Sequence, residues 1–217
     1  KLYIILASTD PSLGTKGITA FLISGDNPGL TVGPPEHKMG IKGSATCEVV
    51  LNDCKVSEKD ILGKIGEGFR LALAGLDCGR IGIATQAVGI AQGALDETIA
   101  YVKQRYQFGK PISRQQNTQF TLAQLQSQTD ACRLMVWRAA ALRDAGKPFG
   151  TEAAMAKLLA SQNAVMTTEK CVQLFGGYGY IRDYPVERMM RDAKITEIYE
   201  GTSKAQKIVI SRNLLTR

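Results

Sequence analysis

The stretch RIGIATQAVGIAQGALDETIAYVKQ, residues 80–104, decides the fold. Its apolar residues recur at helical spacing and fall on one face: Ile81, Ala84, Val88, Ala91, Leu95, Ile99 and Val102. A seven-residue recurrence of this kind is typical of a helix with one buried side. We therefore predict one long helix that extends beyond these bounds, with a shorter helical stretch from Phe69 to Leu76 leading into it.

The helical period continues to the end of the chain. A second helix is predicted from about residue 116 to 144, where Gly146 and Pro148 end it. Thr151, followed by Glu152, is expected to cap a third helix. The glycines at 176, 177 and 179 stop that helix, and shorter helices are expected after Pro185 and over 203–214. The short connections predict an all-α antiparallel bundle of four to five helices.

Residues 1–62 have a different period. Continuous apolar runs cover Leu2–Ala7 and Ile18–Ile23, and residues 47–51 alternate, which indicates three or four strands separated by Gly and Pro. So few strands make a poor independent sheet. We predict a mixed fold in which a small antiparallel β segment, an incomplete β-domain over 1–62, is followed by a helical domain over 63–217.

Composition excludes several classes of function. The net charge is +7, but the basic residues are scattered, which argues against nucleic-acid binding. Five cysteines without a C-x-x-C pair and a single His predict no metal site and reduced core thiols, as in a cytoplasm or an organelle matrix. No apolar run approaches the ~20 residues of a membrane span. The first residues, KLYIILAS, already form a strand-like run without Met, which suggests a piece of a longer protein.

Three segments break the helical pattern. The first, QLFGGYGY at 173–180, is either a helix cap with its loop or a surface where backbone approaches a flat or phosphorylated ligand. The second, RYQFGKP at 105–111, is either a helix end carrying a favourable cation or, with Gln116, a dinucleotide contact. The third, IYEGTS at 198–203, makes Glu200 either a solvated residue of a capped turn or a catalytic base.

Together these segments resemble the acyl-CoA dehydrogenases, particularly the short-chain, butyryl-CoA-like branch. The resemblance rests on six stretches in register over most of the chain: TVGPPEHKMGIKGSATCEVVLNDCKV, GEGF, LDCGRIGIATQAVGIAQGALDETIAY, RYQFGKPI, QLFGGYGY and YPVERMMRDAKITEIYEGTS. The resemblance implies that Glu200 removes the pro-R α-proton of an acyl-CoA thioester while the β-hydrogen leaves as hydride to a flavin. A second branch of the family takes its base from the position that is Gly79 here, so Glu200 has no competitor.

The resemblance also implies the binding residues. Acyl-CoA contacts map to Asp77, Cys78, Gly79, Arg80 and Gly201. FAD contacts map to Arg105, Gln107, Phe108, Gln116, Gln173, Leu174, Phe175, Gly176, Gly177, Thr202, Ser203 and Lys204. Relatives often carry Gln or Glu at position 204, which puts the contact of Lys204 in doubt. The contacts from Arg105 to Gly177 generally reach the FAD of an adjacent subunit, so a homo-oligomer, a dimer or a dimer of dimers, is expected.

The implied function is FAD-dependent α,β-dehydrogenation of short-chain acyl-CoA to trans-2-enoyl-CoA, with electrons passed to an electron-transferring flavoprotein. The implied location is a bacterial cytoplasm or the mitochondrial matrix. Two alternatives stay open. The chain could be a truncated, non-catalytic bundle that serves only assembly, or part of an acyl-CoA oxidase that re-oxidises its flavin with oxygen.

Overall fold

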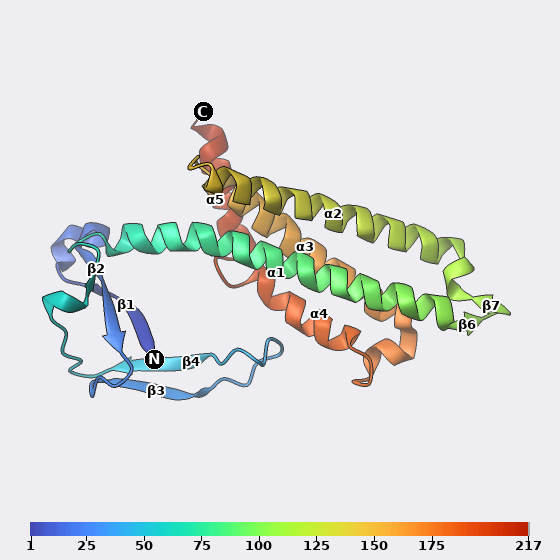
Figure 1. Cartoon of the computed structure of the whole chain (residues 1–217), viewed down its shortest axis with the longest axis horizontal. Coiled ribbons are helices and arrows are strands. Elements are labelled where there is room, and N and C mark those ends of the chain that lie inside the picture. The colour runs from blue at the N-terminus through green and yellow to red at the C-terminus, as the bar shows by residue number, and fades with distance from the viewer. Residues whose placement is uncertain (217) are drawn as a thin grey trace. The chain divides into compact units, whose positions relative to one another are not determined.

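The computed structural model describes residues 1–216, which form two compact units. The first unit contains residues 1–38 and 42–76, and the second contains residues 39–41 and the chain from Asp77 onward. Strands dominate the first unit and helices the second, so the predicted mixed fold is confirmed (Figure 1). The expected domain division at residues 62 and 63 stays a prediction.

The first unit holds two small antiparallel sheets. One has the strand order β1–β2–β5 and the other pairs β3 with β4. The strands are β1 Leu2–Ser8, β2 Ile18–Ser24, β3 Leu30–Pro35, β4 Cys47–Leu51 and β5 Ile61–Leu62. Phe21, Ile23 and Leu30 form the buried cluster of this unit.

The predicted count of three or four strands was too low. β3 was missed because Gly33, Pro34 and Pro35 look like turn residues, yet Pro35 pairs with Cys47 at an irregular point of the ladder. Proline is tolerated there because a two-stranded sheet has only edge strands, where a missing N–H can face away from the partner. β5 is two residues long, too short to show a period.

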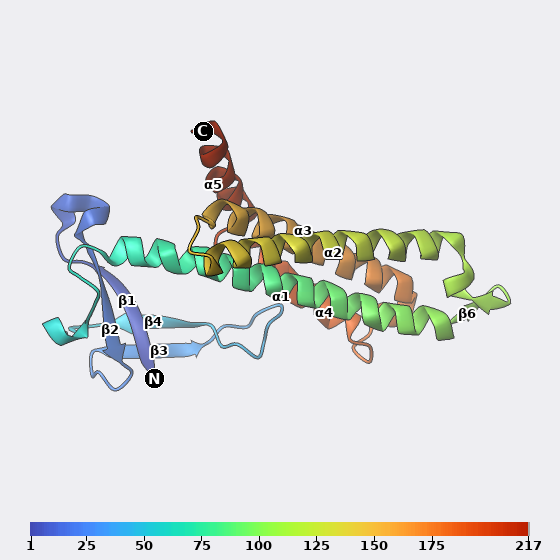
Figure 2. The same cartoon turned by 45° about the horizontal axis from the view of Figure 1, so that its top comes forward.

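Five α-helices follow. They are α1 Gly68–Gln104, α2 Gln116–Asp144, α3 Gly150–Phe175, α4 Val186–Lys194 and α5 Ser203–Leu215. A hairpin of β6 Tyr106–Gln107 and β7 Lys110–Pro111 joins α1 to α2, and 3₁₀ turns cover Gly176–Tyr180 and Ile195–Glu197. In both views α1, α2 and α3 lie side by side, and the short connections reverse the direction of the chain (Figures 1 and 2).

The long helix extends beyond 80–104, as expected, and also takes in 69–76, which was predicted as a separate, shorter helical stretch. Together they form one helix of 37 residues, because no proline interrupts them. One boundary prediction was wrong. Thr151 is not the cap of α3. Phe149 occupies that position and makes no side-chain capping bond, and Thr151 already lies inside the helix.

Small residues fill the core of the second unit. Its largest cluster combines Val88 of α1 and Cys132 and Val136 of α2 with alanines of α1, α3 and α4: Ala84, Ala87, Ala91, Ala156, Ala160, Ala164 and Ala193. Alanine side chains let helix backbones approach closely, and interiors packed at crystal-like density leave no spare volume. The alanines of α1 therefore fix how near its partners lie.

Residues 39–41 pack on α4. The Ile41 N–H donates to Asp192 Oδ1 at 2.6 Å, and Arg191 Nη1 donates to the Met39 carbonyl at 2.8 Å. A Cβ at Gly40 would stand 2.5 Å from the Arg191 carbonyl oxygen, so only glycine fits at this contact.

We expect Ala91→Leu to lower the free energy of unfolding by about 1–3 kcal/mol, because the added volume has no space in the core. Equilibrium unfolding in urea measures the change. Ala100→Leu is the matched control, since Ala100 is exposed on the same helix. Equal effects of the two substitutions would contradict the tight alanine interface.

Candidate active site

Glu200 sits in a strained turn before α5. Its φ is +54° and that of Gly201 is +89°, both in the left-handed region. That region costs a residue with a Cβ roughly 1–2 kcal/mol. The side chain is partly buried, and its Oε2 is buried without a hydrogen-bond partner within residues 1–216. A strained backbone with an unpaired buried carboxylate oxygen is more typical of a functional group than of a solvated turn.

The carboxylate of Glu200 lies against the bare backbone of Gly79 on α1. A Cβ at Gly79 would stand 2.6 Å from Glu200 Oε2 and 3.1 Å from Oε1. The structure thus brings together Glu200 and Gly79, the two positions to which the family resemblance assigns a base in one branch or the other. Gly79 leaves the space that the carboxylate occupies.

Asp77 and Arg80, which are one helical turn apart on α1, form an ion pair close to Gly79. Arg80 Nη1 donates to Asp77 Oδ1 at 2.5 Å, and only 10% of the Arg80 side chain is exposed. Arg80 Nε is buried without a partner in the described chain. Cys78, between them in sequence, is partly buried. The four predicted acyl-CoA residues of α1 therefore lie within one turn, next to Glu200.

Two buried side chains hold the backbone of the turn. Lys157 of α3 donates from Nζ to the Gly201 carbonyl at 2.7 Å. Gln206 of α5 donates from Nε2 to the same carbonyl at 2.8 Å and to that of Glu200 at 3.1 Å. Both side chains are fully buried. Tyr199 adds an anchor, since its hydroxyl is hydrogen-bonded to Gln86 Oε1 on α1.

The pKa of Lys157 is lowered from 10.5 to about 8. Burial is the main cause, because a low dielectric disfavours the charged form. The charge of Glu197 raises this pKa, that of Arg80 lowers it and that of Glu200 raises it. The turn is therefore held by a lysine of α3, Lys157, which loses its proton within a few pH units of neutrality.

The other residues predicted after the base have different surroundings. Thr202 caps α5, accepting a bond from the Ala205 N–H at 3.3 Å. Ser203 Oγ is buried without a partner in the described chain, and Lys204 is exposed. Ser203 therefore has a free hydroxyl to offer a ligand.

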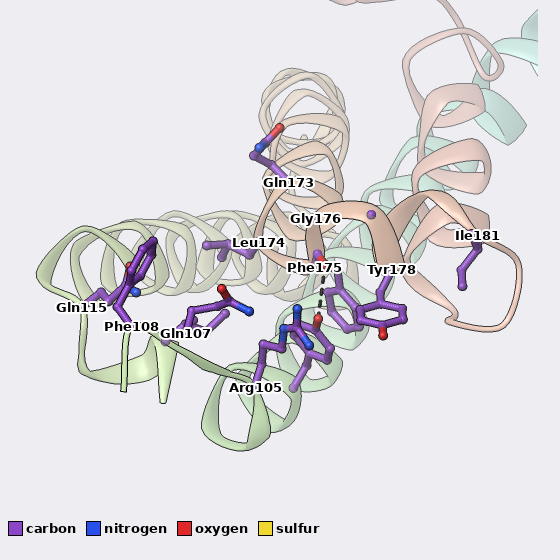
Figure 3. Close-up of a pocket in the computed structure, with 13 residues that line it drawn as sticks. Arg105, Gln107, Phe108, Gln115, Gln173, Leu174, Phe175, Gly176, Tyr178 and Ile181 are labelled. Atoms are coloured by element: carbon purple, nitrogen blue, oxygen red, sulfur yellow. Dashed lines mark hydrogen bonds between the residues drawn. The ribbon is translucent and has the colours of Figure 1, made fainter. Parts of the chain in front are cut away.

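A second candidate region lies at the far end of α1. A cavity of about 520 Å³ is lined by the end of α1, the β6–β7 hairpin and the end of α3 (Figure 3). Eight predicted FAD residues line it: Arg105, Gln107, Phe108, Gln173, Leu174, Phe175, Gly176 and Gly177. Five further lining residues were not predicted: Tyr101, Ile112, Gln115, Tyr178 and Ile181. Gln116 does not line it; its neighbour Gln115 does.

The cavity fits a flat, phosphorylated ligand. Positions where a Cβ of Gly176 or Gly177 would stand are open, with no atom within 4 Å, so a ligand can reach the backbone. The rings of Tyr101 and Phe175 stack with their centroids 4.0 Å apart. The Arg105 Cζ lies 5.3 Å from the centroid of the Tyr178 ring. Guanidinium geometry matches phosphate. Phe108 at the hairpin is 91% exposed and free to cover a ligand.

The two regions are far apart within one chain. Gly79 and Arg105 are separated by 26 positions of one continuous helix, or about 39 Å at 1.5 Å per residue. The two regions are therefore separate surfaces within a single copy of the chain.

The profile of the acyl-CoA dehydrogenase C-terminal domain matches residues 66–215. The chain belongs to the acyl-CoA dehydrogenase family. It is 50% identical over 214 residues to a short-chain specific acyl-CoA dehydrogenase of Megasphaera elsdenii, covering 99% of this chain and 56% of that protein. It is equally similar, at 50% over 214 residues, to an acryloyl-CoA reductase (NADH) of Anaerotignum propionicum, of which it covers 54%.

Solved structures agree with this assignment to the acyl-CoA dehydrogenase family. The butyryl-CoA dehydrogenase of Megasphaera elsdenii has a TM-score of 0.97 and 50% identity, covering 99% of this chain and 56% of that one. A chain described with the electron transferring flavoprotein of Acidaminococcus fermentans has a TM-score of 0.98 and 49% identity. The match covers 100% of this chain and 57% of that one. The chain spans about half the length of the relatives it matches.

Other predicted features can be located on the structure. Its five cysteines are free thiols. Cys132 and Cys171 are buried, and Cys54 is partly buried against the core of the first unit, whereas Cys47 and Cys78 are only partly buried, so the prediction of core thiols was wrong for these two. Within residues 1–216 no cluster of three metal-ligating side chains occurs. No helix of that range has both the length and the apolar character to cross a membrane.

Lys157 and Gln206 were not among the residues predicted for the site. A signal for Lys157 was present, because in AAMAKLLAS it shares a helical face with Ala153, Ala160 and Ser161, all fully buried. A lysine at helical spacing from small residues is a candidate for burial. No comparable signal marks Gln206.

Gly79→Ala should displace the Glu200 carboxylate, because the new methyl group would overlap Oε2. A crystal structure of the variant measures the displacement. Gly82→Ala, one turn along α1 with open space at its Cβ position, is the control. It should stabilise the helix by up to about 1 kcal/mol and leave Glu200 in place. An unmoved carboxylate in Gly79→Ala would contradict the contact.

The depressed pKa of Lys157 predicts a pH dependence of stability. Between pH 8 and 10.5 the unfolded chain still binds the proton that the folded chain has lost, so the free energy of unfolding rises with pH. The rise is at most about 3 kcal/mol. Urea unfolding measures this free energy across the range in the native chain and in Lys157→Met, which serves as the reference because all other groups titrate in both proteins. The difference between the two free energies should grow with pH. A difference that stays constant would contradict the lowered pKa of Lys157.

Proposed function

We propose that the protein containing this chain is an FAD-dependent acyl-CoA dehydrogenase that converts short-chain acyl-CoA thioesters to trans-2-enoyl-CoA, with Glu200 as the base. The observation that carries the proposal is the buried, unpartnered Oε2 of Glu200 against the bare backbone of Gly79. This oxygen has a free lone pair and a space beside it, as proton removal from a bound substrate requires. The high identity to short-chain enzymes supports the substrate class.

In this proposal the residues of the turn before α5 and the facing residues of α1 each have a role. Glu200 accepts the α-proton, and its backbone N–H donates to the thioester carbonyl, which stabilises the enolate-like charge that develops. Gly79 and Gly201 let the thioester lie close to the backbone. Asp77, Cys78 and Arg80 bind the acyl-CoA, and the Asp77–Arg80 pair keeps both side chains ordered.

The cofactor of the proposed enzyme is FAD, which supplies an acceptor for the β-hydrogen as hydride. We propose that the cavity around Arg105, Gln173 and Gly177 holds the FAD of a second subunit. The residues Thr202 to Lys204 contact the FAD beside Glu200, with Ser203 Oγ as the unpartnered donor. The separation of about 39 Å along α1 supports a homo-oligomer, a dimer or a dimer of dimers.

The remaining assignments complete the proposal. Electrons pass to an electron-transferring flavoprotein, a partner supported by the 49% identical chain from Acidaminococcus fermentans. The location is a bacterial cytoplasm or the mitochondrial matrix. Residues 1–62 belong to the middle β-domain of the family and residues 63–217 to its C-terminal helical domain.

A second candidate is the reverse reaction, favoured by the 50% identical acryloyl-CoA reductase. The same carboxylate, once protonated, can return a proton to the α-carbon, so the site serves both directions. The redox partner then decides the direction. Reduction of acryloyl-CoA with NADH, set against dehydrogenation of butyryl-CoA, compares the two functions.

The proposal predicts that the flavin spectrum of the protein containing this chain bleaches with butyryl-CoA. Glu200→Gln should keep the flavin bound but slow bleaching by roughly 10²–10⁴-fold, because the general base is lost. Stopped-flow absorbance measures the rate.

Glu169→Gln removes the same charge at an exposed position of α3 and is the control. A colourless native protein would instead support a bundle that serves assembly, and oxygen consumption without an added acceptor would support an oxidase. Undiminished bleaching in Glu200→Gln would overturn the role of Glu200.

A further inference from the structure

The turn that carries the base is held from two different helices. The Gly201 carbonyl accepts from Lys157 Nζ on α3 and from Gln206 Nε2 on α5, and the Glu200 carbonyl accepts from Gln206 as well. Both donors are fully buried. The strained left-handed φ of Glu200 needs such support, because an unsupported turn would relax and move its side chain.

Burial of a lysine at this position lowers the stability of the fold. Transfer of an ammonium group from water to a buried site costs several kcal/mol, and an apolar side chain of similar size would pack without that cost. The charged groups that face Lys157 are Glu197 from the 3₁₀ turn, Glu200 from the held turn and Arg80 from α1. The charges of two carboxylates and one guanidinium thus act on the ammonium group, and one of these carboxylates is the proposed base.

We propose that Lys157 is a positioning residue, which together with Gln206 fixes the Glu200–Gly201 turn so that the carboxylate points at the open face of Gly79. This inference rests on the proposed function, because it concerns the same base. Lys157 does not touch the substrate. It acts through the Gly201 carbonyl, and a small displacement of that carbonyl changes the direction of the Glu200 side chain next to it.

The test is Lys157→Met in the protein containing this chain. We expect flavin content to be unchanged, the bleaching rate at saturating butyryl-CoA to fall about 10–100-fold, and the half-saturating concentration to change less than threefold. A base misplaced by about 1 Å can cost 10²-fold in rate without affecting substrate binding. A crystal structure of the variant should show the Glu200 carboxylate moved from Gly79.

Thr168→Val is the matched control. It removes a buried donor from the same helix, one that bonds only carbonyls of α3 itself, so the rate should stay within twofold of native. A Lys157→Met variant with native rate and an unmoved carboxylate overturns the inference. Loss of flavin or of substrate affinity in parallel with the rate overturns it too, because that result indicates a general structural role.

If Lys157→Met does not fold, Gln206→Met tests whether the hydrogen bonds to the turn position Glu200. It removes the other two bonds to the turn from α5, and the same loss of rate without loss of affinity is expected. A native rate in Gln206→Met would contradict the inference. If the native protein does not bleach with butyryl-CoA, the proposed function fails, while the position of the carboxylate in the two variant structures still tests what holds the turn.

Discussion

The continuous run of α1 from Gly68 to Gln104 is the constraint on which the helical unit depends. Its alanine face sets how closely α3 and α4 pack, and its length sets where the two candidate regions lie. Gly79 is near one end of the buried stretch and Arg105 follows the other. Both regions are therefore fixed to the same rigid element and cannot approach each other.

The turn at Glu200 shows how a bundle supports chemistry. Helices satisfy their own backbone groups, so they offer few free polar atoms for catalysis. The turn before α5 escapes this limit, because its two carbonyls are satisfied by Lys157 and Gln206 rather than by a helix. The backbone can then hold a strained conformation and leave the carboxylate oxygen unpaired.

The sequence predicted the helices well because their apolar period is strong over many turns. α2 was predicted at its observed bounds, and the end of α3 at Gly176 followed from the glycines. The sequence did not predict β3, because Pro35 pairs where proline is normally a breaker, nor the cap of α3, where Phe149 replaces a polar residue. The site residues came from a family resemblance, whereas the meeting of Gly79, Lys157 and Gln206 at the turn depends on contacts between distant segments that no local pattern encodes.

The uninterrupted geometry of α1 gives the two regions a fixed phase as well as a fixed spacing. Each residue of an α-helix turns the chain by one part in 3.6, about 100°. A single inserted or deleted residue between Gly79 and Arg105 would thus swing one region around the helix axis relative to the other. Side chains along α1 can therefore be exchanged one at a time, whereas a change of one residue in the length of this segment would alter the direction in which one region faces relative to the other.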